Sequence, residues 1–217
     1  MDTGTPLPPG RKPILCYVTD RLALKAAPGT DALLAGIRNA VTAGVDWIQI
    51  REKDLEARAL VALVRLALES TRGTGTKVLV NDRLDIAIAA GAAGVHLGET
   101  SLPVERVTEW RRSARLMDFQ IGVSCHSTEA AKAAQRGGAD YIFFGPVFST
   151  PSKIAFGPPQ GIERLREVCM AVQIPVLAIG GVNLENASSC VEAGAAGIAA
   201  IRLFQEVPEA VVRLREK

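Results

Sequence analysis

Hydroxyl, lysine and glycine residues gather in one stretch of the chain, residues 143–161, with the sequence FFGPVFSTPSKIAFGPPQG. An apolar run at 141–144 ends at a Gly-Pro pair, and four polar side chains then follow within five positions: Ser149, Thr150, Ser152 and Lys153. The pattern predicts a buried strand that opens into a long polar loop. Hydroxyls, a lysine and unpaired backbone N–H groups can hold an anion such as phosphate. A solvated surface loop is the alternative. The residues at the ends of the other strands must distinguish between the two interpretations.

Short apolar runs alternate with helical patterns along the whole chain. The expected strands are 14–19, 47–50, 77–80, 94–97, 119–123, 141–144, 176–179 and 197–201. The expected helices are 32–43, 55–70, 84–90, 104–113, 128–136, 162–171, 184–192 and 208–215. Such strand-then-helix units predict an α/β protein with a single (β/α)₈ barrel, a TIM barrel. A doubly wound open sheet is the alternative, but its GxGxxG fingerprint does not follow the first strand.

Two stretches at helix-to-strand connections nearly repeat each other. They are GAAGVHL at 91–97 and GAAGIAA at 194–200. Each delivers the end of an expected helix into an expected strand, as the tight turn of a repeated βα unit does. The repeat therefore supports the barrel.

The bulk composition limits the class of protein. The chain has 217 residues, 48% of them hydrophobic and 5% aromatic, which suits helices packed on parallel strands. A net charge of +2 implies no general attraction to nucleic acid, and no apolar run reaches transmembrane length. The four cysteines show no CxxC spacing, so we expect buried free thiols and a cytoplasmic location. Residues 1–12 are expected to be a disordered lead-in, and residues 13–217 one barrel domain.

In a barrel of this kind the C-terminal ends of the strands form the active site. The sequence places polar or glycine residues at almost every such end: Arg51, Lys53, Asn81, Asp82, Glu99, Ser124, His126, the stretch 149–153, Gly180, Gly181 and Arg202. The cations are candidates for binding a polyanion, and Asp82 is a candidate ligand for Mg²⁺ against that polyanion. The diglycine and the loop after the eighth strand lie where barrels commonly bind phosphate. Small phosphorylated molecules are therefore the expected partners.

Five ordered segments at these strand ends form a recognisable set: QIREKD, VNDRLDIAIAAGAAGVHLGE, GVSCHS, ADYIFFGPVFSTPSK and PVLAIGGV…AGAAGIAAI. Together they resemble the thiamine phosphate synthase family, from the second strand to the eighth. The resemblance implies a (β/α)₈ barrel that joins a pyrimidine methyl pyrophosphate to a thiazole phosphate, uses Mg²⁺ and releases pyrophosphate. A sister group with the same barrel is a thiazole tautomerase, which isomerises the thiazole carboxylate phosphate.

The resemblance also implies roles for individual residues. Arg51, Asn81 and Lys153 would hold the pyrophosphate, and Asp82 matches a magnesium ligand. The candidates for catalysis are Arg51, Lys53, Ser124, His126 and Lys153. The candidates for substrate binding are Gln49, Asn81, Thr150, Ser152, Gly180, Gly181, Ile201 and Arg202. Of these, Gln49, Arg51 and Lys53 match the family's QxRxK motif, and Gly181 matches a backbone donor to the thiazole phosphate.

Three positions depart from the family's pattern. Ser101 stands where the family has its second magnesium aspartate, Glu99 where it usually has glutamine, and Arg202 where it has a small serine. The change at Ser101 keeps two alternatives open. One is a thiazole tautomerase with His126 as the general acid and base. The other is a catalytically idle barrel that binds a thiazole or thiamine phosphate.

Several polar side chains also have purely structural interpretations. A histidine just past a strand end, such as His126, often only hydrogen-bonds a backbone carbonyl. His96 lies inside an expected strand, where an inward position in a barrel is a packing position. Arg111, Arg112 and Arg115 are expected to form a solvated helix face rather than a nucleic-acid patch. Neither a membrane nor a nucleic acid is an expected partner, and formation of a homo-oligomer is left open.

Overall fold

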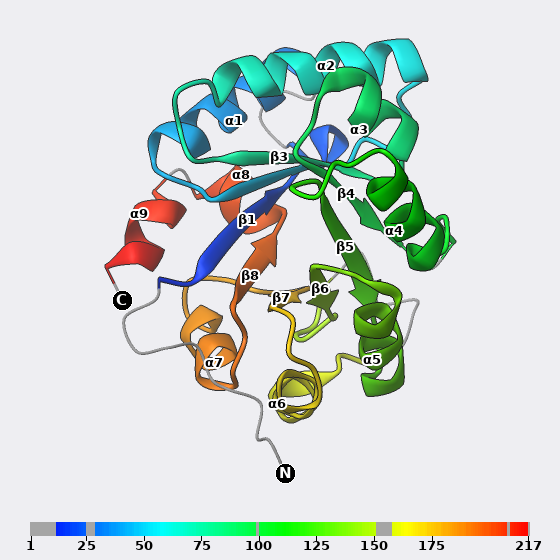
Figure 1. Cartoon of the computed structure of the whole chain (residues 1–217). Helices are drawn as coiled ribbons and strands as arrows, with labels where there is room; N and C mark the ends of the chain where they lie inside the picture. Colours follow the sequence, from blue (N-terminus) through cyan, green and yellow to red (C-terminus); the bar gives the residue numbers. More distant parts are fainter. Residues whose placement is uncertain (1–11, 25–28, 99, 151–157, 208, 217) are drawn as a thin grey trace.

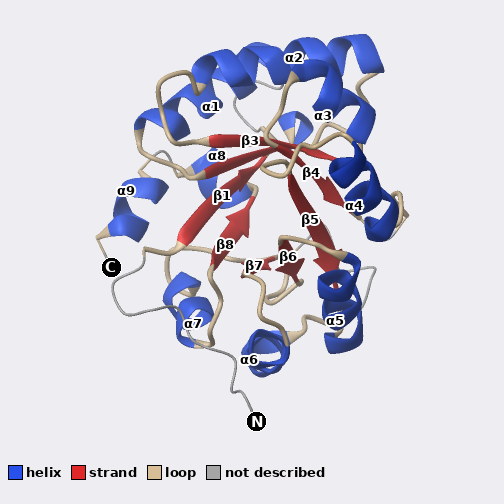
Figure 2. Cartoon of the chain, viewed as in Figure 1, coloured by secondary structure: helices blue, strands red, loops and turns tan. Residues whose placement is uncertain are grey.

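Eight parallel strands close into a barrel in the computed structural model, which describes residues 12–24, 29–98, 100–150, 158–207 and 209–216 (Figure 1). Each strand pairs with the next in the sequence, and β8 pairs with β1 to close the barrel. Figure 2 shows the strands in the middle and the helices around them. The (β/α)₈ barrel predicted from the sequence is confirmed. Of the predicted lead-in 1–12, only Lys12 lies within the described residues.

Strands and helices alternate as the sequence pattern predicts. The strands are β1 Ile14–Val18, β2 Trp47–Ile50, β3 Lys77–Asn81, β4 Gly94–Leu97, β5 Gln120–Cys125, β6 Tyr141–Phe144, β7 Val176–Ile179 and β8 Gly197–Ala200. The helices are α1 Thr30–Thr42, α2 Ala57–Ser70, α3 Leu84–Ala90, α4 Val104–Ser113, α5 Thr128–Gly137, α6 Gly161–Ala171, α7 Ala187–Glu192, α8 Arg202–Glu206 and α9 Ala210–Arg215, together with the 3₁₀ helix η1 Arg21–Ala23. In the described ranges no helix combines the length and hydrophobicity needed to cross a membrane.

The sequence analysis missed two short helices and misplaced the start of another. It did not predict η1 or α8, each of which is five residues or shorter. It placed the start of α7 at residue 184, whereas the helix begins at Ala187. The reason is an Asn turn: Asn183 Oδ1 accepts the N–H groups of Glu185 and Asn186 and so holds them outside the helix. Ser124, expected to follow a strand, lies within β5.

Side chains that point into the barrel fill its interior below the mouth. The inward cluster consists of Cys16, Val18, Trp47, Leu79, Tyr141, Phe143, Leu177 and Ala199. The rings of Trp47 and Tyr141 lie 4.7 Å apart between centroids. Gly122 leaves room for this packing, because a Cβ there would lie 2.1 Å from the Tyr141 ring. The barrel interior is therefore a packed core, and ligands are expected to bind at its carboxyl-terminal mouth.

Arg111 contradicts the prediction of a solvated arginine face on α4. Its side chain is buried, forms an ion pair with Asp140 at 2.5 Å and donates to the carbonyl of Phe119 at 3.0 Å. Asp140 also accepts the N–H of Ile121 at 2.7 Å, so the pair ties α4 to the start of β5. Arg112 and Arg115 are exposed, as predicted.

Candidate functional site

The carboxyl ends of the strands surround one cavity of about 1440 Å³. It is lined by every predicted site residue that the structure describes: Gln49, Arg51, Lys53, Asn81, Asp82, Ser124, His126, Thr150, Gly180, Gly181, Ile201 and Arg202. The predictions about Glu99, Ser152 and Lys153 lie outside the described residues. The barrel thus brings together side chains that are up to about 150 positions apart in the sequence, because all strands end at the same rim.

Gln49 and Asn81 form a polar pair on the neighbouring strands β2 and β3. Gln49 Nε2 donates to Asn81 Oδ1 at 2.9 Å, which fixes the orientation of both amides. The Gln49 side chain is buried, and its Oε1 has no hydrogen-bond partner among the described residues. A buried acceptor without a partner is costly. Because it lies in the cavity wall, it is suited to accept an N–H from a ligand.

Asp82 directly follows β3 and has an unusual backbone conformation. Its φ of 66° is in the left-handed region, which is uncommon for residues other than glycine. Its N–H donates to the carbonyl of His96 at 2.8 Å, which holds the turn in place. Its carboxylate accepts a hydrogen bond from Ser101 Oγ, which in turn accepts the N–H of Gly98 at 2.7 Å. Ser101 therefore lies beside Asp82, where the sequence comparison with the family had placed a second metal-binding residue.

The donor set at Asp82 suits Mg²⁺ only together with a ligand. Among the described residues no group of three or more His, Cys, Asp or Glu side chains could hold a metal ion by itself. Magnesium, however, usually keeps several waters and is bound by one or two carboxylates plus substrate phosphates. One carboxylate at the cavity wall, with a serine hydroxyl against it, meets that requirement.

Arg51 and Lys53 bring positive charge to the same side of the cavity. Both line it, and the N–H of Arg51 donates to Thr19 Oγ1 at 2.9 Å. Within the described ranges, neither side chain forms an ion pair with a carboxylate. Their charges are therefore available to an anionic ligand.

His96 links the barrel core to the cavity. Its side chain is 1% exposed, its Nε2 lies 2.9 Å from Ser124 Oγ, and its Nδ1 lies 3.2 Å from the Tyr141 hydroxyl. Burial lowers the pKa of His96 to about 3, so the ring is neutral at physiological pH. The predicted packing role is confirmed by the stacking of His96 on Phe143 at 4.1 Å between ring centroids. Sequence reasoning missed its second role, which is to orient the Ser124 hydroxyl at the cavity wall.

His126 forms a hydrogen bond between its Nδ1 and the carbonyl oxygen of Gly145. Because a carbonyl only accepts, this nitrogen must carry the proton. The bond ties the residue after β5 to the residue after β6. The structure thus shows the backbone hydrogen bond that a structural role of His126 requires, and the side chain also lines the cavity.

The diglycine after β7 forms the opposite corner of the cavity. Gly180 and Gly181 have φ values of 92° and 67°. A Cβ on Gly180 would lie 2.6 Å from Pro146, and one on Gly181 would lie 2.5 Å from the carbonyl oxygen of Ser149. Both positions therefore require glycine, because the loop after β7 lies directly against the loop after β6. In the described part of the chain the Gly181 N–H has no acceptor, and Thr150 and Arg202 line the cavity with it.

Comparison with known proteins gives a consistent result. Residues 15–204 match the family model described as "Thiamine monophosphate synthase". A relative from Geobacter sulfurreducens is 46% identical over 201 residues, which cover 93% of this chain and 91% of the relative. The "Thiamine-phosphate synthase" of Roseiflexus castenholzii is 41% identical over 204 residues, with 94% and 86% covered. Among solved structures, "Thiamine phosphate pyrophosphorylase from Pyrococcus furiosus" is 32% identical, with a TM-score of 0.80 and 95% and 96% of the two chains covered.

Proposed function

The chain belongs to the thiamine monophosphate synthase family, and we propose that it acts as a thiamine-phosphate synthase. In this reaction a transferase joins a pyrimidine methyl pyrophosphate to a thiazole phosphate and releases pyrophosphate. The observation that supports the proposal is that one cavity is lined on two sides by groups suited to bind anions. Arg51, Lys53 and Asp82 line one side, and Thr150 and the diglycine line the other. Two phosphorylated substrates need two such sides.

The chemical problem is the departure of pyrophosphate from the methylene carbon. The carbon–oxygen bond breaks with both electrons going to the pyrophosphate, and the thiazole nitrogen then forms the new bond to carbon. Charge on the leaving group must be stabilised, which is the task of preorganised cations and hydrogen-bond donors. Arg51 and Lys53 supply the cations, and Asn81 is held in place by Gln49. Gln49 Oε1, a buried acceptor without a partner among the described residues, would accept an N–H of the pyrimidine.

The second substrate would bind on the β6–β7 side. The Gly181 N–H and the Thr150 hydroxyl are uncharged groups that suit a phosphate monoester. Arg202 adds a positive charge at the same rim. Ser124, oriented by neutral His96, lies between the two sides and can position the reacting rings.

Asp82 is the residue that would hold Mg²⁺, with waters and pyrophosphate oxygens completing the shell. Bound Mg²⁺ supplies Lewis-acid stabilisation of the leaving pyrophosphate. Ser101, whose hydroxyl bonds the same carboxylate, orients Asp82 for this role. Because the chain supplies a single family-matched carboxylate, we expect weak Mg²⁺ binding until pyrophosphate is present.

No protein nucleophile is needed for this chemistry, and the cysteines are unsuited to be one. All four are free thiols, and burial raises the pKa of Cys16, Cys169 and Cys190. Free thiols also support a reducing compartment, and we place the enzyme in the cytoplasm on that ground.

The test is incubation with both substrates, with and without Mg²⁺, while thiamine phosphate is followed by its fluorescence after oxidation. We expect product only when both substrates and Mg²⁺ are present. Turnover of the thiazole carboxylate phosphate alone, without metal, would instead identify a tautomerase. Binding of thiazole phosphate with no turnover of any substrate would identify an idle barrel.

A further inference from the structure

The sequence after β2 alternates cations and anions: Arg51, Glu52, Lys53 and Asp54. Arg51 and Lys53 are two of the cations that line the cavity. Adjacent opposite charges attract each other, and a carboxylate close to either cation would weaken its hold on a phosphorylated ligand. The partners of the Glu52 and Asp54 carboxylates therefore affect how strongly the cavity can bind a phosphorylated ligand.

Arg21 from η1 binds both of these carboxylates. Its Nη1 lies 3.1 Å from Glu52 Oε2, and the same guanidinium forms a two-pronged contact with Asp54 at 2.6 and 2.5 Å. Such a forked contact is the geometry in which arginine binds carboxylate best. The guanidinium of Arg21 lowers the pKa of Asp54, so that this carboxylate stays ionised while it is bound.

Glu52 is held most firmly. Its side chain is 2% exposed and accepts hydrogen bonds from Thr19 Oγ1 at 2.6 Å and from the N–H of Arg21 at 3.1 Å. The Thr19 hydroxyl also accepts the N–H of Arg51 at 2.9 Å. The Thr19 hydroxyl thus connects the Glu52 carboxylate to the backbone of Arg51. This connection fixes the position of the Arg51 backbone just after β2.

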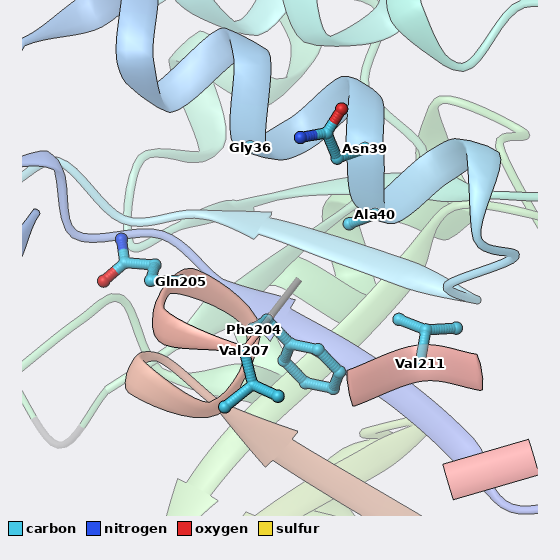
Figure 3. A pocket seen from close by; sticks show the side chains of 7 residues that line it. All are labelled: Gly36, Asn39, Ala40, Phe204, Gln205, Val207 and Val211. Carbon is cyan, nitrogen blue, oxygen red and sulfur yellow. The ribbon is translucent and has the colours of Figure 1, made fainter. Parts of the chain in front are cut away.

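Helix α8 also contacts the segment that carries Arg21. Gln205 Nε2 donates to the carbonyl of Asp20 at 2.8 Å. Figure 3 shows Gln205 and Phe204 on the short helix, with Gly36 and Ala40 of α1 nearby. The guanidinium is therefore presented to Glu52 and Asp54 by a backbone segment that Gln205 holds at Asp20 and Glu52 holds at Arg21.

We propose that Arg21 is a positioning residue that captures Glu52 and Asp54 and thereby keeps Arg51 and Lys53 available to the pyrophosphate end of the substrate. This inference rests on the proposed function, since that function supplies the polyanion. Arg21 itself need not touch the substrate. Removing it releases two carboxylates beside the two cations, which then compete with the ligand for them.

The experiment measures binding of inorganic pyrophosphate by titration calorimetry at fixed ionic strength, in the presence of Mg²⁺. Arg21→Met should raise the dissociation constant about tenfold, the effect of one strong charge contact. Adding Asp54→Asn to Arg21→Met should bring it back to within about threefold of the parent value, because one of the released carboxylates is then neutral. Arg72→Met is the matched control, because it removes the same charge from a surface ion pair away from the cavity and should change nothing.

A second measurement separates positioning from a general loss of structure. In Arg21→Met the KM for the pyrimidine pyrophosphate should rise, while the KM for the thiazole phosphate should stay unchanged. Arg21→Lys keeps a positive charge but cannot form the two-pronged contact with Asp54, so its affinity for pyrophosphate should be intermediate. This variant replaces Arg21→Met in the experiment if the methionine variant does not fold.

Equal loss of affinity in Arg21→Met and in the double variant would overturn the inference, because Arg21 would then act through folding alone. Unchanged pyrophosphate affinity in a folded Arg21 variant, with the parent chain active as a synthase, would overturn it and leave the proposed function standing. Absence of pyrophosphate binding in the parent chain would overturn both.

Discussion

The two halves of the barrel, β1–β4 and β5–β8, share one strand geometry. In the first half Leu79 of β3 pairs with Gly94 of β4, and in the second half Leu177 of β7 pairs with Gly197 of β8. The near repeat of GAAGVHL and GAAGIAA leads into β4 and β8, the last strand of each half. Strands four positions apart in order are therefore equivalent, and residues can be compared across the barrel pair by pair.

The amino-terminal ends of the strands show the same correspondence. In each half an aspartate just before the second strand accepts an N–H from the first strand and binds an arginine from an outer helix: Asp46 with Leu15 and Arg215, and Asp140 with Ile121 and Arg111. These contacts lie away from the mouth and serve stability. The closed end of the barrel is thus built alike in both halves.

At the mouth the equivalent positions differ sharply. At the end of β3 the chain has Asn81 and Asp82, and at the matching end of β7 it has Ile179 and Gly180. Asp82 and Gly180 share a positive φ, 66° and 92°. The first half therefore presents a carboxylate on a positive-φ residue where the second half has a glycine. The comparison supports our proposal that one frame binds anions in two ways, through side chains with Mg²⁺ at the end of β3 and through backbone N–H groups at the end of β7.

The largest loss of activity is expected when the residue after β3 is replaced by the glycine found at the equivalent position after β7. Asp82→Gly should keep the turn, because glycine adopts a positive φ without strain. It should lower kcat by about 10²–10³-fold, the typical loss when one electrostatic contact to the transition state is removed. Asp82→Asn, which keeps the shape and removes the charge, should lose about as much. The kcat of both variants is measured in steady-state assays at saturating Mg²⁺, and thermal unfolding checks that they are as stable as the parent. An active Asp82→Gly enzyme would mean that the two ends do not differ in function as argued.

The reverse change adds a side chain to the glycine that follows β7, and it should destabilise the fold. Gly180→Ala combines a strained positive φ with a Cβ 2.6 Å from Pro146. Strain and overpacking together should lower the free energy of unfolding by about 2–4 kcal/mol. Gly91→Ala is the matched control, since Gly91 has a φ of 79° and nothing within 4 Å of the added Cβ. Its loss should be about 1 kcal/mol, from strain alone. Equal losses in urea denaturation would show that the contact with Pro146 is unimportant.

Much of the fold followed from local signals. Short apolar runs between Ala/Gly-rich turns fixed β2, β4, β6 and β7 to the residue. The two missed helices, η1 and α8, are too short to show a period, and distant contacts hold them in place. Arg21 of η1 binds carboxylates more than 30 positions away, and Gln205 of α8 bonds Asp20 across 185 positions. No local pattern contains such partners.

The site was predictable wherever strand ends alone determine it. Asn81 ends β3, and Asp82 and Gly181 follow strands, so the barrel topology brings all three to one cavity. What could not be predicted were the contacts between strands. The bond from His96 to Ser124 and the capture of Glu52 by Arg21 depend on the register of β4 with β5 and of β1 with β2. Register is a property of the closed barrel rather than of any one segment.

His96 offers a smaller test of the comparison, since its equivalent in the second half is Ala199. Its folded pKa of about 3 lies below the unfolded value, so the unfolded chain takes up the proton first as pH falls. Stability should therefore decrease below about pH 6.5. The parent chain should lose about 2 kcal/mol between pH 7 and pH 5 from this group. In His96→Gln, urea denaturation at the two pH values should show a difference smaller by that amount. The same pH dependence in both proteins would contradict a buried neutral histidine.

The smallest loss of activity is expected at His126, where the proposed synthase and the tautomerase alternative predict different results. In the synthase no proton passes through this ring, and its Nδ1 is engaged by the Gly145 carbonyl. His126→Asn keeps a donor for that carbonyl, so synthase activity should stay within about tenfold of the parent, well below the roughly 10²–10⁴-fold that general acid–base catalysis contributes. Asp82→Asn, assayed beside it, supplies the contrast, because its loss should be far larger on the same substrates. If His126→Asn instead abolishes turnover while Asp82→Asn is tolerated, the reactive side of the mouth lies at β5–β6, and the charged rim of the first half is not where the chemistry occurs.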